Sequence, residues 1–211
     1  MQTQKSLSGR SFGILGDSYS TFQGYIPEDY IFYYPAPERV DDVLAVEDTW
    51  WHILMRQNDL QLARNNSYSG STVCTHVREN HPKSGSFVAR AKDYFSGDVP
   101  MDYIFIFGGT NDSWLDRPAG QLQFSDWTEE DLMQVLPAYC NILDHITKHN
   151  PQSKVIAVVN TGLHPKIHNG IMDAAIHYGV TVVVLCDIDK QNGHPSALGM
   201  RQIAEQIAPA L

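Results

Sequence analysis

The sequence predicts a three-layer α/β/α domain around a five-stranded parallel sheet. Five short apolar runs alternate with amphipathic stretches along the 211 residues. The runs are apolar at consecutive positions rather than at every second one, which indicates strands buried on both faces. Right-handed crossovers between successive parallel strands place helices on both faces of such a sheet.

Polar clusters follow four of the five expected strands. The strands are expected at 12–15, 60–63, 103–107, 155–159 and 180–185, and the clusters occupy 16–18, 65–70, 108–112 and 187–194. The carboxyl ends of parallel strands share one edge of a sheet, and ligands bind there. We therefore expect these clusters to form the functional site.

The clearest expected helix begins at Thr128, with Asp131 at the capping-box position, and ends at Asn150. Pro137 lies inside this stretch and is expected to kink the helix. A last helix is expected to start at Pro195, a residue favoured in a first turn. The other helices are expected at 50–56, 87–95 and 165–178.

Length and composition bound the classes of function. A length of 211 residues suits one domain spanning 1–211, and the net charge of −9 without a basic run argues against nucleic acid as a partner. No stretch is suited to crossing a membrane or lying on one. Three scattered cysteines, Cys74, Cys140 and Cys186, predict buried thiols rather than a disulfide framework.

The first residues, 1–5, are polar, which predicts that no signal peptide is present. The protein is then cytoplasmic, or it is the mature part of an exported protein whose leader has been removed. The sequence leaves this choice and the oligomeric state open.

Two polar residues at the expected sheet edge suit nucleophilic catalysis. Ser18 ends a Gly-Asp-Ser turn after the first strand, and a serine hydroxyl becomes a good nucleophile once a base takes its proton. By itself such a turn is more typical of a helix cap. His194 follows the last strand and can reach the same edge; its position, not its type, distinguishes it among nine histidines.

Two further residues could bind a developing oxyanion. Asn111 follows the most apolar strand and can donate its amide N–H, although a Gly-Asn turn is the simpler interpretation. Gly70 lies after the second strand, where a glycine lets a backbone N–H approach a substrate oxygen closely, although a flexible loop explains it equally well.

Taken together and in this order, these residues resemble the SGNH hydrolases, also called the GDSL-like lipase/acylhydrolase family. Its four blocks carry Ser, Gly, Asn and His in that chain order. Ser18, Gly70, Asn111 and His194 match the four blocks in turn, and the resemblance extends over about 11–208.

The resemblance implies a flavodoxin-like domain and hydrolysis of an ester, sometimes of a thioester or amide. Carried over, Ser18 attacks the carbonyl carbon, and His194 takes the hydroxyl proton and returns it to the leaving alcohol. The backbone N–H groups of Ser18 and Gly70 and the side-chain amide of Asn111 bind the oxyanion. No metal and no organic cofactor is implied.

The sequence departs from the family at Gln191, where most members carry an aspartate three residues before the histidine. That carboxylate fixes the imidazole tautomer and stabilises the imidazolium. Three alternatives stay open: Gln191 or a backbone carbonyl orients His194 in a Ser-His dyad, Asp189 or Asp187 takes the role, or the site is degraded and slow. The two aspartates lack an evident third ligand, so no metal site is expected.

An aromatic segment over 22–51 and Trp114 suggest the substrate. The segment could contact sugar faces, form a lid or dimer contact, or cover the domain internally. No long apolar patch suits a fatty acyl chain. These features favour a short-chain, above all acetyl, esterase acting on a small-molecule or saccharide ester. The alternatives are a non-catalytic carbohydrate-binding protein on the same fold, or a lipase or thioesterase of the family.

Overall fold

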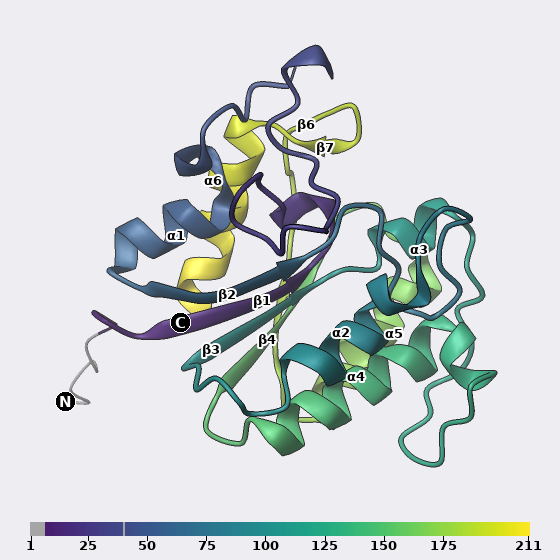
Figure 1. Cartoon of the computed structure of the whole chain (residues 1–211). Coiled ribbons are helices and arrows are strands. Elements are labelled where there is room, and N and C mark those ends of the chain that lie inside the picture. The colour runs from purple at the N-terminus through teal and green to yellow at the C-terminus, as the bar shows by residue number, and fades with distance from the viewer. Residues whose placement is uncertain (1–6, 40) are drawn as a thin grey trace.

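The computed structural model describes residues 7–39 and 41–211 and shows one parallel sheet between two helical layers (Figure 1). The strands are β1 (Ser11–Gly16), β2 (Gln61–Ser67), β3 (Tyr103–Phe107), β4 (Lys154–Val159) and β5 (Thr181–Val184). They lie in the order β2-β1-β3-β4-β5, and every neighbouring pair is parallel. The predicted fold class is confirmed. The polar N-terminus, on which the signal-peptide prediction rests, lies outside the described residues.

Helices cover both faces of the sheet (Figure 1). One face carries α1 (Trp50–Asn58) and α6 (Ala197–Ile207); the other carries α2 (Phe87–Tyr94), α4 (Val135–His149) and α5 (Pro165–His177). The short helix α3 (Thr110–Trp114) follows β3, and a hairpin of β6 (Lys190–Gln191) and β7 (His194–Pro195) precedes α6. Among the described residues, no helix is both long and apolar enough to cross a membrane.

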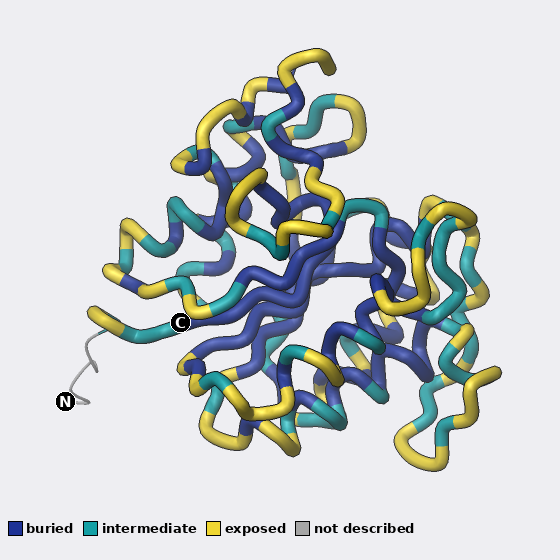
Figure 2. Tube along the Cα trace, viewed as in Figure 1, coloured by how far each residue is buried: buried dark blue, intermediate teal, exposed yellow. Residues whose placement is uncertain are grey.

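The sheet is the buried centre of the molecule, and exposed residues lie mostly on outer loops and helix surfaces (Figure 2). The exceptions within strands are near strand ends and on the edge strands, such as Gln61 of β2 and Val184 of β5. All five residues of β3 are buried, because side chains on both of its faces meet a helical layer. Two apolar clusters result, one on each side of the sheet. Trp50 and Trp51 both belong to the core, and their indole N–H groups donate to Ser20.

The long helix expected from Thr128 is divided in two. Thr128 and Asp131 do form a capping box, but it closes a separate 3₁₀ turn, Asp131–Met133. Gln134 is extended, and α4 begins at Val135. Pro137 therefore lies in the first turn of α4, where a backbone N–H has no helical acceptor, and the predicted kink is wrong.

Two smaller expectations also need correction. The last helix begins at Ala197 rather than Pro195, because Ser196 is its N-cap and accepts a hydrogen bond from Gly199 N at 3.1 Å. Cys74 and Cys140 are buried thiols as predicted, whereas Cys186 is exposed.

A buried arginine joins the elements that lead into the polar edge of the sheet. Arg90 of α2 is fully buried and donates five hydrogen bonds. Nη2 reaches Gly16 O at 3.0 Å and Ser71 Oγ at 2.8 Å, Nε reaches Gly85 O at 3.0 Å, and Nη1 binds Asn66. The guanidinium thus ties the end of β1 to the loop after β2.

We expect Arg90→Leu to lower the free energy of unfolding by about 3 kcal/mol or more, because it leaves several buried carbonyl groups without a donor. Urea denaturation of the variant and the wild type measures this change. Lys92→Leu, on the exposed face of the same helix, is the matched control and should change stability by less than about 1 kcal/mol. Equal effects of the two variants would contradict this role of Arg90.

Candidate active site

Ser18 and His194 meet at the carboxyl edge of the sheet. Ser18 begins a 3₁₀ turn directly after β1, with Asp17 as its N-cap, and His194 lies in β7 of the hairpin. Ser18 Oγ is 2.9 Å from His194 Nε2, and the two residues are only 3% and 8% exposed. The hairpin is held by Tyr19, whose hydroxyl donates to Gly193 O at 2.5 Å. A shielded hydroxyl–imidazole pair results.

The surroundings of His194 fix which nitrogen accepts. Nδ1 lies 3.3 Å from Asn192 O, and because a carbonyl oxygen only accepts, Nδ1 carries the proton. Nε2 is then free to accept from the Ser18 hydroxyl. Among the described residues, the Asn192 backbone carbonyl is the one group considered from the sequence that hydrogen-bonds the imidazole. Gln191 Oε1 is buried without a hydrogen-bond partner there, Asp189 accepts from Ser196 Oγ, and Asp187 makes no hydrogen bond to the ring.

Asn111 and Gly70 are the other two residues that match the family blocks. Asn111 lies in the short helix α3, which replaces the simple turn expected there. Its buried Nδ2 has no acceptor in the part of the chain that the structure describes, and its Oδ1 lies 3.4 Å from Nη2 of Arg78. Because an arginine nitrogen only donates, the amide atom that faces Arg78 is the oxygen Oδ1, and Nδ2 points the other way. Gly70 has a φ of +80°, and a Cβ there would come within 2.7 Å of His81 Nε2, so only glycine fits.

The aromatic segment surrounds His194 in a way that sequence reasoning missed. The Tyr33 ring stacks on the imidazole with centroids 3.5 Å apart and an interplanar angle of 10°, and the Arg39 guanidinium lies 4.8 Å from the Tyr33 centroid. Trp114, 46% exposed, approaches the imidazole edge-on at 5.6 Å. Most aromatic side chains of the segment are core, which supports the internal-cover interpretation, but Tyr25 and Phe32 are exposed.

The family model for GDSL-like lipase/acylhydrolase matches residues 10–211. The chain belongs to this family. It is similar to crystal structures of proteins assigned as GDSL-like lipases from Bacteroides uniformis (38% identity, TM-score 0.90, 96% of this chain and 95% of that one) and Bacteroides ovatus (40%, 0.89, 96% and 98%). A carbohydrate acetylesterase from Sinorhizobium meliloti shares the fold at 16% identity, with a TM-score of 0.60 over 95% and 97% of the chains. The search of curated proteins found no match.

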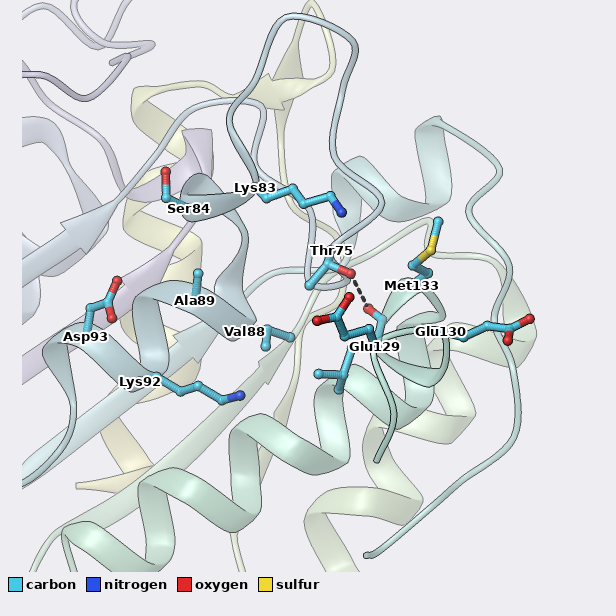
Figure 3. Close-up of a pocket in the computed structure, with 11 residues that line it drawn as sticks. Thr75, Lys83, Ser84, Val88, Ala89, Lys92, Asp93, Glu129, Glu130 and Met133 are labelled. Carbon is cyan, nitrogen blue, oxygen red and sulfur yellow. Dashed lines mark hydrogen bonds between the residues drawn. The ribbon is translucent and has the colours of Figure 1, made fainter. Parts of the chain in front are cut away.

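A large cavity of this GDSL-family protein lies away from the Ser18–His194 pair. Its volume is about 670 Å³, and it opens between α2 and the segment around 129–133 (Figure 3). Thr75 Oγ1 donates to Leu132 O at 3.1 Å across its wall. Lys83 and Lys92 line it together with Glu129 and other residues, but none of the four family-block residues does. The site is therefore defined by its chemistry and not by this cavity.

Burial sets the protonation state of His194. Desolvation lowers the pKa of this imidazole to about 4; the Asn192 carbonyl opposes the shift, and the positive charges of Arg39, Lys190 and Arg78 add to it. The imidazole is therefore neutral, and able to accept a proton, from mildly acidic pH upward.

We expect Gln191→Asp to raise the pKa of His194 by roughly one unit or more, because a carboxylate beside the imidazole favours its charged form. Titration of the imidazole by NMR measures this directly. Gln152→Asp introduces the same charge just before β4, at the opposite edge of the sheet, and should leave the titration unchanged. An unchanged pKa in Gln191→Asp would show that the side chain at 191 does not approach the ring.

Asp17, the residue before Ser18, is a buried carboxyl of which only one oxygen has a hydrogen-bond partner among the described residues. Oδ1 accepts from Tyr19 N at 3.1 Å, whereas Oδ2 has no hydrogen-bond partner within 7–39 and 41–211. Burial raises the pKa of Asp17 to about 7, against the lowering effects of the Tyr19 N–H and the Arg90 charge. The folded protein thus holds a proton that the unfolded chain loses near pH 4, and stability falls as pH rises between about 4 and 7.

We expect Asp17→Asn to remove this part of the pH dependence. The unfolding free energy of the wild type should decrease relative to that of the variant by up to about 1.4 kcal/mol per pH unit between these limits, because only the wild type can lose the proton. Chemical denaturation at pH 5, 6, 7 and 8 gives both curves. Parallel curves would contradict a raised pKa at Asp17.

Proposed function

We propose that this protein is a serine esterase that removes short acyl groups, above all acetyl, from small-molecule or saccharide esters. The observation that carries the proposal is the 2.9 Å contact between Ser18 Oγ and His194 Nε2, with the tautomer set by the Asn192 carbonyl. An adjacent base of this kind converts a serine hydroxyl into a nucleophile.

In the proposed reaction, Ser18 Oγ attacks the ester carbonyl carbon while His194 Nε2 takes the hydroxyl proton. The negative charge that develops on the carbonyl oxygen is bound by Asn111 Nδ2 and by the backbone N–H groups of Ser18 and Gly70. One such donor is typically worth roughly 10²–10³ in rate. His194 then protonates the leaving alcohol and activates a water molecule, which releases the acid from Ser18.

The preference for a short acyl group rests on enclosure. Ser18 and His194 are almost fully buried, and Tyr33 covers one face of the imidazole. The exposed ring of Trp114, beside the imidazole, is suited to a sugar face. Solved structures with the same fold include carbohydrate esterases. Their sequence identity to this chain is 14–16%, so this likeness supports the fold and not the substrate.

A second candidate function is carbohydrate binding without hydrolysis. It is favoured by the one departure from the family pattern, because His194 has no carboxylate behind it and burial lowers its pKa. The imidazolium that forms during acylation then lacks an opposite charge in hydrogen-bond contact.

We expect p-nitrophenyl acetate to be hydrolysed faster than the butyrate and octanoate esters. Ser18→Ala should lower kcat by roughly 10³-fold or more, because Ser18 carries the one hydroxyl that hydrogen-bonds His194 Nε2 among the described residues. Ser84→Ala, an exposed serine, is the matched control and should keep wild-type turnover. Circular dichroism establishes that each variant is folded.

Two results would count against the esterase. Retained turnover in Ser18→Ala would remove Ser18 from the mechanism. Glycan binding by a folded wild type that hydrolyses no ester, together with no labelling of Ser18 by a fluorophosphonate, would favour the carbohydrate-binding protein.

A further inference from the structure

A second cavity adjoins the groups proposed to bind the oxyanion. It has a volume of about 410 Å³ and is lined by Arg78, Glu79, Asn80, His81, Leu115 and Arg117. Two contacts connect it to the site: Arg78 Nη2 lies 3.4 Å from Asn111 Oδ1, and His81 Nε2 lies 3.1 Å from the carbonyl oxygen of Ser69, the residue before Gly70. A molecule with its ester at Ser18 can therefore extend along this wall.

Three nitrogens in this wall are buried and have no hydrogen-bond partner among the described residues: Arg78 Nε, His81 Nδ1 and Arg117 Nε. The remaining nitrogens of Arg117 are engaged, with Val77 O at 2.9 Å and His76 Nε2 at 3.1 Å. A buried nitrogen without a partner costs free energy, and such groups in native structures call for an explanation. The Arg78 and Arg117 Nε–H groups are donors, which suit a ligand with acceptor oxygens. His81 Nε2 donates to Ser69 O, so Nδ1 of the neutral ring is an acceptor and suits a donor group instead.

The charge of the cavity points to the same class of ligand. Two guanidinium groups line it against a single carboxylate, the exposed Glu79, in a chain with a net charge of −9. A guanidinium is planar, keeps its charge and binds a carboxylate through parallel hydrogen bonds. Leu115 supplies an apolar surface beside them.

We propose that this cavity is a subsite for a carboxylate carried by the alcohol part of the ester, so that the substrate is an anionic ester such as that of an acidic sugar. The inference rests on the proposed esterase function. Arg78 contacts both Asn111 and the cavity, so the subsite and the oxyanion donors hold two parts of one substrate.

The test compares esters that differ only in charge. The 3- and 4-acetoxybenzoates are anionic, and the corresponding acetoxybenzamides have the same shape without the charge. Rates are divided by those of hydroxide-catalysed hydrolysis to remove leaving-group differences. We expect kcat/KM for at least one benzoate to exceed that of its amide by about tenfold, the effect of one charge-assisted hydrogen bond. Added salt should reduce this ratio.

Arg78→Gln and Arg117→Gln should each bring the benzoate-to-amide ratio towards one, mainly through KM for the benzoate. Lys83→Gln removes an exposed cation from the cavity of Figure 3 and serves as the matched control, for which the ratio should stay at the wild-type value. A wild-type ratio near one for both isomers, or a ratio unchanged in both arginine variants, would overturn the proposal.

Failure of the esterase itself gives a different result. If neither the benzoates nor the amides are hydrolysed, the proposed esterase function fails. The carboxylate subsite is then tested by measuring ligand binding without hydrolysis. Calorimetry of folded Ser18→Ala with 4-hydroxybenzoate and 4-hydroxybenzamide then decides: tighter binding of the anion, lost in Arg78→Gln/Ser18→Ala, supports the subsite, and equal binding overturns it.

Discussion

The geometry of the site depends on one buried cation. Within the described part of the chain, Arg90 hydrogen-bonds no carboxylate; its charge is stabilised by oxygens of the backbone and of neutral side chains. An unpaired buried charge would be strongly unfavourable, and these acceptors therefore have to stay in place. Two of them flank the functional residues: Gly16 O comes just before the turn of Ser18, and Ser71 Oγ comes just after Gly70. Because Arg90 needs these acceptors, it holds the Ser18 turn and the loop that contains Gly70 in fixed positions relative to each other. Burial lowers its pKa only to about 10, so the charge persists at neutral pH.

A second constraint is that the proposed base works while it is buried. Desolvation favours neutral His194, which is the state that accepts a proton, but it also penalises the imidazolium formed in acylation. The Asn192 carbonyl partly offsets this penalty, because it accepts a hydrogen bond from Nδ1–H of the imidazolium. Tyr33 recovers another part, because a cation over an aromatic face is attracted by its quadrupole. In the proposed mechanism, the Asn192 carbonyl orients the imidazole, and the carbonyl and the Tyr33 ring partly stabilise its charge; in most family members an aspartate has both roles.

The sequence predicted the sheet because strands that are buried on both faces have apolar residues at consecutive positions. It also predicted which loops converge, since the ends of parallel strands share an edge. It could not predict the break at Gln134, where the Thr128–Asp131 box closes its own turn instead of starting α4. The roles of Arg90 and Tyr33 were missed for another reason: their partners are far away in the chain, and Gly16 lies 74 residues from Arg90. The group that orients His194 is a backbone carbonyl, which every residue carries and no sequence pattern marks.

Gln191 and the cationic surroundings of the site are physically consistent with each other. Arg39, Lys190 and Arg78 all lower the pKa of His194, and an aspartate at 191 would offset them. With a neutral side chain there, no charge at position 191 offsets the three cations, and an anionic group bound near them would be favoured. A carboxylate bound at Arg78 would offset that charge and raise the pKa of the imidazole. The base would then become stronger when an anionic substrate is in place, so that the substrate itself supplies part of the charge that the family aspartate provides elsewhere.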